Sequence, residues 1–435
     1  MRLTRGTMIV TAVSALAAAA PGLALAQPGF GAAQEVRLPE PGSPLVLDAG
    51  RQQISVVLVA GGLVGPWDIE FLPNDEGILV TESPGRLRLI RGGTLQPEPV
   101  WEVPPPGGRD VLHGVVAHPD FDENRLVYVS YTKADDSAAA AGASASGQPG
   151  ASGQRNALLT LAIARGRLEN GRLVDTEEIF AADAWETASN ATAGRMIFGP
   201  DGSLYVSVGD RDRLCCGPND DNSIRIKAQD LGSHIGKVLR LTDDGGVPDD
   251  NPFVGRAGAK SEIFTYGNRN AYGFAFHPET GELWSVEIGP NGGDELNILL
   301  PGRNYGWPLV SLGRNYSGTR VSDQPWYRPG MEMPVLHWTP VISPSSLAFY
   351  TGDRFPRWKG NLFVTALSGQ RVVRLAFNER GLLGRPSPML TELGVRFRDV
   401  EQGPDGYLYF ATEVRYGSGN PDGTVLRIEP VESSE

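Results

Sequence analysis

The chain has 435 residues, a formal net charge of −12, 55 glycines, 34 prolines and only two cysteines. The acidic balance argues against nucleic acid or an anionic membrane as partner, whereas neutral ligands and divalent cations are compatible with it. The glycine and proline content, with little helix-like periodicity, favours an all-β design, which can run to this length as one domain.

The first 26 residues have the pattern of a secretory signal peptide. Arg2 and Arg5 form the charged start, residues 8–25 are apolar and alanine-rich, and an Ala-Leu-Ala sequence suits cleavage after Ala26. The separated arginines favour export in unfolded form over the twin-arginine route. No later apolar run reaches the ~18 residues of a membrane span. We therefore expect a periplasmic protein without a membrane span.

One β unit recurs along residues 51–435, after a linker and approach strand at residues 27–50. Each copy reads as a strand, a turn rich in Pro, Asp or Gly, a second strand, and then a basic or apolar strand. The copies begin at Gly65, His113, Gly194, Thr265, Ser345 and Phe397. A β unit that cannot bury both of its faces alone is expected to stack radially, so six copies predict a six-bladed β-propeller.

The length between copies varies, and the excess falls in loops. Residues 134–155 are low-complexity Ala, Gly and Ser, which predicts a flexible surface insertion. Residues 211–236 and 302–340 are long but rich in Trp, Tyr, Pro and Asn, so we expect them to be ordered. Long ordered loops on one face of a propeller usually build its ligand site.

The fourth copy, residues 265–295, contains a hairpin between two unusual loops. Residues 267–270 hold an arginine between asparagines, and residues 289–295 are glycine-rich and end in an Asp-Glu pair. Loops that combine an arginine, amides, exposed carbonyls and carboxylates can bind an anionic ligand and a hard cation together. The alternative is a solvated turn with a structural acidic pair.

The two cysteines, Cys215 and Cys216, are neighbours. In an oxidising compartment they can close on each other as a vicinal disulfide, in a strained ring. The alternative is a pair of reduced thiols in a loop. We favour the disulfide, because no other partner exists in the chain.

Several stretches, in their order, are specific for a known family. They are Pro66-Trp-Asp-Ile-Glu-Phe-Leu-Pro, Phe198-Gly-Pro-Asp-Gly, Gly236-Lys-Val-Leu-Arg-Leu, Tyr266-Gly-Asn-Arg-Asn, Glu287-Ile-Gly-Pro-Asn-Gly-Gly-Asp-Glu, Asn304-Tyr-Gly-Trp-Pro and Arg396-Phe-Arg-Asp-Val. Over nearly the whole mature chain, the sequence resembles the glucose/sorbosone dehydrogenase family. This resemblance implies a soluble six-bladed quinoprotein that oxidises aldose sugars with pyrroloquinoline quinone (PQQ) and calcium.

The resemblance also implies cofactor-binding residues. Arg396 and Arg398 match a pair of arginines that bind the quinone, and alternation places residues two apart on one face of a strand. Arg269 and Asn270 match a second Arg-Asn pair of the cofactor site. The structural alternative for the first pair is a surface ion pair with Asp399 or Glu401.

Two further features of the family have counterparts here. The main-chain carbonyls of Gly289 and Pro290 match the ligands of the cofactor calcium, and carbonyl oxygens suit a hard cation. Asp210 matches the acidic residue that orients the catalytic histidine of the family. We therefore expect calcium at the first pair and a catalytic role for Asp210.

The sequence departs from the family at three positions. The catalytic histidine of the family, nineteen residues before Asp210, is Ala191 here, and alanine cannot act as a base. A cofactor-contacting glutamine is replaced by Arg109, and a lysine of a later blade by Ser368. The resemblance therefore implies that the binding of an anionic cofactor is kept while the proton acceptor is lost.

Three explanations are open at this point. Another group can supply the base, with His113 as first candidate, next to Arg109 in the second copy, and Asp210 as the second. The site can instead run different chemistry on a different ligand, or bind a ligand without converting it.

The function that we expect is oxidation of a sugar or related alcohol, with electrons passing to quinone and then to a periplasmic acceptor. The alternatives are a non-redox calcium-dependent propeller enzyme, of the lactone hydrolase or sugar lyase type, and a ligand-binding protein with a degenerate dehydrogenase site.

Overall fold

The computed structural model describes residues 35–50, 52–103, 111–135, 158–187, 191–212, 222–324, 326–417 and 419–431. Four sequence-based predictions fall largely or wholly outside these ranges: the signal peptide, Arg109, the vicinal cysteine pair and the low-complexity insertion. Within the described part of the chain, no helix is long and apolar enough to cross a membrane.

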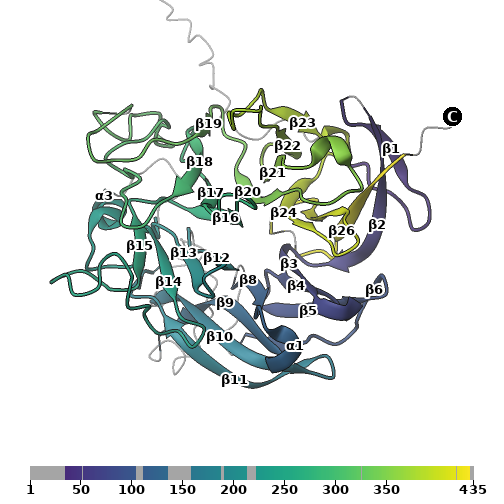
Figure 1. The fold of residues 1–435 in the computed structure, drawn as a ribbon, viewed down its shortest axis with the longest axis horizontal. Coiled ribbons are helices and arrows are strands. Elements are labelled where there is room, and N and C mark those ends of the chain that lie inside the picture. The colour runs from purple at the N-terminus through teal and green to yellow at the C-terminus, as the bar shows by residue number, and fades with distance from the viewer. Residues whose placement is uncertain are drawn as a thin grey trace, which may run out of the picture.

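The predicted six-bladed propeller is confirmed: six antiparallel sheets surround a common axis (Figure 1). In the first five blades the strand nearest the axis comes first in the sequence, and in the sixth blade it precedes the two C-terminal strands β25 and β26. These inner strands are β3 (Pro66–Leu72), β8 (Leu112–Ala117), β12 (Ala193–Phe198), β16 (Ala271–Phe276), β20 (Pro344–Phe349) and β24 (Arg396–Gln402). Each inner strand contacts the next, and β24 contacts β3, so the ring is closed.

The other strands follow outward in each blade. The second strands are β4 (Gly77–Glu82), β9 (Leu126–Ala134), β13 (Leu204–Val208), β17 (Leu283–Glu287), β21 (Leu362–Ala366) and β25 (Leu408–Glu413). The third strands are β5 (Arg86–Arg91), β10 (Leu159–Glu169), β14 (Lys237–Leu241), β18 (Asp294–Leu299), β22 (Arg371–Leu375) and β26 (Gly423–Pro430). The outer strands are β6 (Thr94–Leu95), β7 (Trp101–Glu102), β11 (Arg172–Ala181), β15 (Ile263–Tyr266), β19 (Leu336–Trp338) and β23 (Ser387–Met389).

Helices are short and lie in connections. They are α1 (Phe121–Asn124), α3 (Asn222–Arg225) and the 3₁₀ turns η1 (Pro73–Asp75), η2 (Ile226–Gln229), η3 (Pro356–Trp358) and η4 (Thr391–Leu393).

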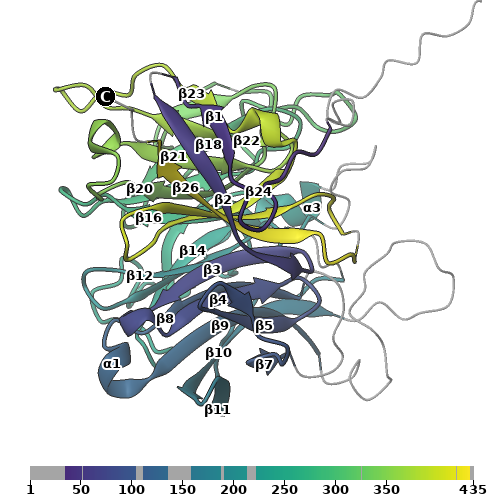
Figure 2. The same cartoon turned by 90° about the vertical axis from the view of Figure 1, so that its right-hand side faces the viewer.

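The sixth blade is completed by the two ends of the described chain. Strand β2 (Gln53–Leu63) pairs antiparallel with β26, and β1 (Leu45–Asp48) pairs with β2 at the edge (Figures 1 and 2). Strand β1 lies in the segment predicted as a linker and approach strand. The ring is thereby closed by backbone hydrogen bonds between strands from opposite ends of the sequence.

The Pro-Asp-Gly turn that marks the repeats forms the same structure in the third and sixth blades. In the third blade Asp201 Oδ1 accepts a hydrogen bond from the Ser203 N–H at 3.0 Å, and Gly202 has φ +73°, a conformation that favours glycine. In the sixth blade Asp405 Oδ1 accepts from the Tyr407 N–H at 3.1 Å, and the next residue, a glycine, has φ +80°. The repeated sequence therefore encodes a repeated hairpin.

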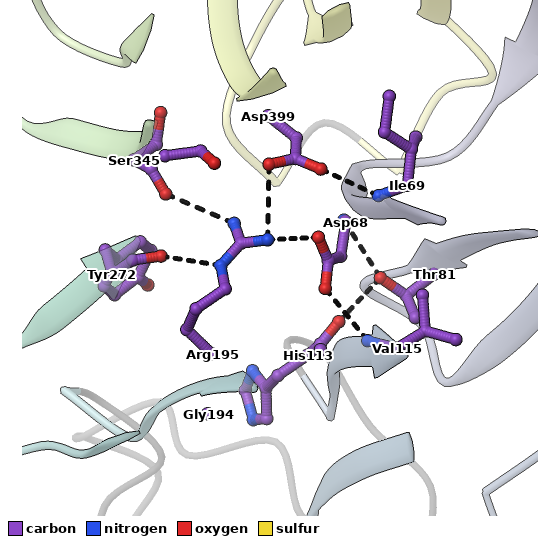
Figure 3. A network of polar contacts seen from close by, with 12 residues as sticks. Asp68, Ile69, Thr81, His113, Val115, Gly194, Arg195, Tyr272, Ser345 and Asp399 are labelled. Atoms are coloured by element: carbon purple, nitrogen blue, oxygen red, sulfur yellow. Dashed lines mark hydrogen bonds and ion pairs between the residues drawn. The ribbon is translucent and has the colours of Figure 1, made fainter. Parts of the chain in front are cut away.

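One buried arginine connects the inner ring (Figure 3). Arg195 on β12 pairs with Asp68 on β3 and, at 3.2 Å, with Asp399 on β24. Its Nε donates to the Tyr272 carbonyl at 2.9 Å, and its Nη2 to the Ser345 carbonyl at 3.3 Å. A single side chain thus joins four other blades to its own.

The two carboxylates that pair with Arg195, which with it form what we call the arginine hub, also link neighbouring inner strands by hydrogen bonds. Asp399 Oδ2 accepts the Ile69 N–H at 2.9 Å, and Asp68 Oδ2 accepts the Val115 N–H at 2.9 Å. Burial raises the pKa of Asp68 well above its ordinary value; Arg195 opposes this shift and Asp399 adds to it. The axis of the propeller is therefore held by a polar network that depends on one cation.

Candidate functional site

The described candidate residues lie at one end of the propeller, the end where the six inner strands begin, which we call the top end. Because the second strand of each blade runs antiparallel to the inner strand, its last residue meets the first residue of the inner strand. Ala271 pairs with Glu287, for example, and Arg396 pairs with Glu413. Loops that precede inner strands and loops that follow second strands therefore gather there.

Arg269 and Asn270 immediately precede β16 and connect two blades. The Arg269 Nη1 donates to the carbonyls of Ile288, at 2.7 Å, and Gly289, at 2.9 Å. The Arg269 carbonyl accepts the Asp210 N–H at 2.7 Å, and the Asn270 carbonyl accepts the Ile288 N–H at 3.1 Å. Both side chains are buried. The structure therefore brings these two residues together with Asp210 and Gly289, as the resemblance implies.

The loop that carries Gly289 and Pro290 is shaped by Asp294. Its Oδ1 accepts the Gly289 N–H at 2.8 Å, and its Oδ2 accepts the N–H groups of Ile342 and Ser343 at 2.7 and 2.8 Å. A side chain at Gly289 would overlap backbone carbonyl oxygens of the same loop. The Gly-Pro-Asn-Gly-Gly-Asp sequence is thus explained by two contacts. The backbone at Gly289 is too close to its neighbours for a side chain, and the Asp294 carboxylate holds the loop by hydrogen bonds to backbone N–H groups.

Arg396 and Arg398 converge on one carboxylate, Glu413 at the end of β25. The distances from Arg396 Nε and Arg398 Nη2 to Glu413 Oε1 are both 2.8 Å. The guanidinium carbons lie 5.6 and 5.5 Å from the ring centroid of Tyr416. The ion-pair partner considered from the sequence, Asp399, instead pairs with the central arginine. Two cations thus share one anion.

Asp210 directly follows the loop end of β13 and is 0% exposed. Its Oδ1 accepts the Asp212 N–H at 3.2 Å, whereas its Oδ2 is buried with no hydrogen-bond partner among the described residues. Burial raises the pKa of Asp210 to about 6, against the opposing charge of Arg269. A carboxylate oxygen with a free lone pair and a pKa near neutrality has the properties of a proton acceptor.

Ala191 lies beside Asp210, where the resemblance places a histidine. The Arg211 N–H donates to the Ala191 carbonyl at 3.3 Å. A side chain added to Gly209 would overlap that carbonyl and lie 2.8 Å from the Asn270 Oδ1. The backbone of Ala191 has φ +49°. The position is therefore adjacent to both the acidic residue and the Arg-Asn pair.

His113, the other candidate base, is a packed side chain on β8. It is 4% exposed, its Nε2 lies 3.0 Å from Thr132 Oγ1, and its ring packs on Gly194 and edge-on to Trp67. Burial, followed by the charges of two arginines, lowers the pKa of His113 to about 3. The imidazole is neutral at ordinary pH and a weak base.

Comparison with known proteins identifies the family. The profile of the family described as Glucose / Sorbosone dehydrogenase matches residues 63–427. The chain belongs to this family. Aldose sugar dehydrogenase YliI of Escherichia coli (strain K12) is 35% identical over 87% of this chain and 93% of its own length. The uncharacterized protein slr1608 of Synechocystis is 36% identical over 88% of each chain.

Solved structures agree with this assignment to the glucose/sorbosone dehydrogenases. The apo-form of the soluble aldose sugar dehydrogenase from Escherichia coli superposes with a TM-score of 0.74 at 33% identity, over 87% of this chain and all of that one (100%). The PQQ-bound form of an aldose sugar dehydrogenase from Streptomyces coelicolor gives a TM-score of 0.64 at 26% identity, over 88% and 99%.

The top end also contains an aromatic residue, Trp307, to which the sequence analysis assigned no role. The ring of Trp307 lies 5.3 Å from the guanidinium carbon of Arg269 and 5.5 Å from that of Arg225. Arg225 pairs with Asp212 at 2.6 Å. The Trp307 Nε1 is buried without a hydrogen-bond partner in the structure. The signal was the family stretch that contains Trp307, in a loop already predicted to be ordered.

Glu413 was also missed, although the repeats mark it. Glu82, Glu287 and Glu413 each end the second strand of their blade, opposite the first residue of the inner strand. All three are buried. Alignment of the copies would have singled out this acidic position, but not which arginines it pairs with.

The donor set fits an anionic quinone. Three buried or largely buried arginines, Arg269, Arg396 and Arg398, supply positive charge at the top end, and Trp307 Nε1 supplies a buried donor. Calcium fits through backbone carbonyls, because a carbonyl oxygen has two lone pairs and Gly289 uses one toward Arg269. Among the described residues, no group of three His, Cys, Asp or Glu side chains could hold a metal ion.

Proposed function

We propose that this protein is an exported quinoprotein that oxidises a sugar or related alcohol with PQQ and calcium. The observation that carries the proposal is the convergence of Arg269, Arg396 and Arg398 at the end of the propeller that also holds Gly289 and Asp210. Buried guanidinium groups gathered at one end of the propeller suit a bound polyanion, because they match carboxylate oxygens in charge and geometry. Membership in the glucose/sorbosone dehydrogenase family makes a quinone the natural candidate.

In this proposal the protein's own residues bind and orient the cofactor. Arg396 and Arg398 would bind the carboxylates of the cofactor through charge-assisted hydrogen bonds, two from each guanidinium where the geometry allows. Arg269 and Asn270 would bind its other edge. The carbonyls of Gly289 and Pro290 would hold calcium. When bound, the quinone supplies the two-electron acceptor for hydride from the substrate carbon, and an external acceptor, which we propose to be periplasmic, then takes the electrons.

Asp210 is the proton acceptor that we propose for the substrate hydroxyl. Its Oδ2 is buried without a hydrogen-bond partner in the described part of the chain, and burial raises the pKa of Asp210 to about 6. His113 is the weaker candidate, because burial lowers its pKa to about 3 and Thr132 lies at hydrogen-bond distance from Nε2. We therefore reverse the order in which the sequence ranked these two bases. We propose that the small side chain of Ala191 lets the substrate approach Asp210 directly.

The two remaining departures from the family remove a cation at one position and add a cation at another. Ser368, in place of a lysine, lies 2.7 Å from Ser343 through their hydroxyls. Arg109, in place of a glutamine, adds a cation at the sequence level but lies outside the described residues. We propose that these two exchanges alter which sugar or alcohol is accepted while the anionic cofactor is kept.

The test is reconstitution of the purified protein with PQQ and calcium, followed by dye reduction over a panel of aldoses, other sugars and alcohols. We expect saturable quinone binding that chelator removes, and dye reduction with at least one substrate. Quinone binding without reduction of dye by any substrate would favour the ligand-binding alternative. Failure to bind quinone, together with conversion of a lactone or a uronic sugar by the calcium form, would favour the non-redox enzyme.

A further inference from the structure

A cavity whose lining includes two arginines lies at the end of the propeller opposite the top end, between the fifth blade and the N-terminal strands. Its volume is about 420 Å³, within the ~300–1,000 Å³ of small-molecule sites. The lining residues include Gln52, Arg357, Trp358, Asn361, Arg374 and Ser387. Asn361 precedes β21 and Arg374 is near the end of β22, so this cavity is at the bottom of the fifth blade, away from the top end.

The repeats show what is unusual about Arg374. The third strands β14, β22 and β26 carry arginines opposite the second residue of the second strand: Arg240 faces Tyr205, Arg374 faces Phe363, and Arg427 faces Tyr409. In the third and sixth blades the arginine pairs with the aspartate of the Pro-Asp-Gly turn, at 2.8 and 3.4 Å. Equivalent arginines are thus neutralised by their own turn.

The fifth blade has lost that turn but kept the arginine. Residues 350–361 replace it, and their acidic residue, Asp353, pairs with Lys359 at 2.7 Å. Arg374 makes no ion pair with any described residue; its guanidinium carbon instead lies 5.6 Å from the ring centroid of Trp358. Burial lowers the pKa of Arg374, and no carboxylate counters the shift. A cation is therefore kept where its usual anion is missing.

The rest of the cavity lining adds to this excess of positive charge. Arg357 forms no ion pair within the described ranges, and none of the described residues that line the cavity is a carboxylate, although the whole chain carries a net charge of −12. Gln52 Nε2 and Asn361 Oδ1 are both buried without a hydrogen-bond partner among the residues that the structure describes. The Ser387 backbone is in register with Arg374 on the next strand. Two guanidiniums, an amide N–H donor and a hydroxyl thus face one small volume.

We propose that this cavity binds a small phosphomonoester, with its phosphate between Arg357 and Arg374. Guanidinium groups match the geometry of phosphate oxygens, and the cation–aromatic contact with Trp358 holds one of them in place. Asn361 Oδ1, an acceptor, suits a hydroxyl on the organic part of the ligand. The volume leaves room for such a substituent beyond the phosphate. The site requires neither quinone nor calcium and is independent of the proposed oxidation.

The test is isothermal titration calorimetry on the quinone-free protein, with inorganic phosphate, glucose 6-phosphate and glucose as separate probes at constant ionic strength. We expect glucose 6-phosphate to bind, inorganic phosphate to bind at least about tenfold more weakly, and glucose not to bind at the cavity. Arg374→Gln and Arg357→Ala should each weaken glucose 6-phosphate binding at least tenfold. Arg380→Ala, which removes the same charge from the same blade outside the cavity, should leave it unchanged.

Several outcomes would overturn the proposal. They are the absence of glucose 6-phosphate binding in the wild type, equal affinity in the wild type and Arg357→Ala, and equal losses in Arg357→Ala and Arg380→Ala. Equal binding of both phosphates would overturn the assignment to an ester and leave a simple anion site. Because Arg357 is exposed, its variant is expected to fold even if Arg374→Gln does not. Quinone binding measured on the same preparations reports separately on the proposed function.

Discussion

At the residue scale, the carboxyl of Asp210 determines how the proposed reaction depends on pH. Burial raises the pKa of Asp210 to about 6, and only the ionised form can accept a proton. We expect kcat/KM to fall about tenfold per pH unit below that value. Asp210→Asn should lower kcat by roughly 10²–10⁴-fold and abolish this acidic limb. A loaded variant that keeps both the rate and the limb would remove Asp210 as the base.

The same carboxyl has a consequence for stability that needs no cofactor. Its pKa is raised from 3.8 in the unfolded reference to about 6 in the folded protein, so the folded state binds the proton more tightly. Its contribution to stability is therefore present below pH ~4 and is lost as pH rises through about 6. We expect Asp210→Asn to be more stable than the wild type at pH 7 and not at pH 4. Urea unfolding at both pH values measures this.

Ala191 provides the second prediction at this scale. Ala191→His should raise aldose oxidation, because Asp210 is adjacent to orient a new imidazole, and a positioned base is worth up to roughly 10²–10⁴-fold. Histidine is among the residues that tolerate the positive φ observed there. Ala191→Gln, which adds bulk and hydrogen bonding without a comparable base, is the control. Equal rates for the two variants with quinone bound would contradict the prediction.

The family resemblance supplied most of the top-end side chains, and the structure changes the order in which we propose the two candidate bases. The sequence analysis placed His113 before Asp210 for its position near Arg109 in the second copy, and burial is not visible in a sequence. The structure shows that burial acts in opposite directions on the two groups: it lowers the pKa of the imidazole and raises that of the carboxyl. The roles of all these residues, and the Cys215–Cys216 disulfide, stay predictions.

At the scale of single elements, β24 carries both arginines of the pair and β25 carries their carboxylate partner. Alternation predicted that Arg396 and Arg398 share a face, and both reach Glu413. The partner was missed because it lies on the neighbouring strand, and cross-strand register follows from the fold and not from local spacing. The turn motifs, by contrast, were predicted correctly, because aspartate and glycine satisfy the turn backbone within a few residues.

We expect Arg398→Ala to weaken quinone binding by about 2 kcal/mol or more, because a charge-assisted bond to the quinone is lost. Arg396→Ala should have a similar effect, and Arg398→Lys a smaller one, because lysine keeps the charge but not the fork. Arg380→Ala on an exposed turn is the control. Quinone titration monitored by equilibrium dialysis measures the affinities. Equal affinities for the wild type, Arg396→Ala and Arg398→Ala would exclude the pair from the site.

At the scale of the whole molecule, six copies in the sequence sufficed to predict six blades, but not the arginine hub on the axis. Arg195 meets Asp68 and Asp399 only because the ring brings together strands far apart in sequence. We expect Arg195→Met to lower the free energy of unfolding by roughly 3–5 kcal/mol, since two buried carboxylates lose their cation. Urea unfolding at pH 7 measures the loss.

A second variant separates lost charge from lost packing at the hub. Arg195→Met combined with Asp68→Asn and Asp399→Asn should recover part of the stability, because no uncompensated carboxylate is then left on the axis. If Arg195→Met unfolds at the same urea concentration as the wild type, the ion network does not stabilise the ring.

The pairing of β2 with β26 sets the order in which the protein can be completed during translation. Strand β2 leaves the ribosome before any blade exists, and its partner follows only after the other five blades have been synthesised. Until then the edge of β2 that pairs with β26 has no partner strand, and the contact between β24 and β3 cannot form. A nascent chain can therefore fold its blades one by one but cannot close the ring. A factor that binds the open chain can do so at any time during synthesis.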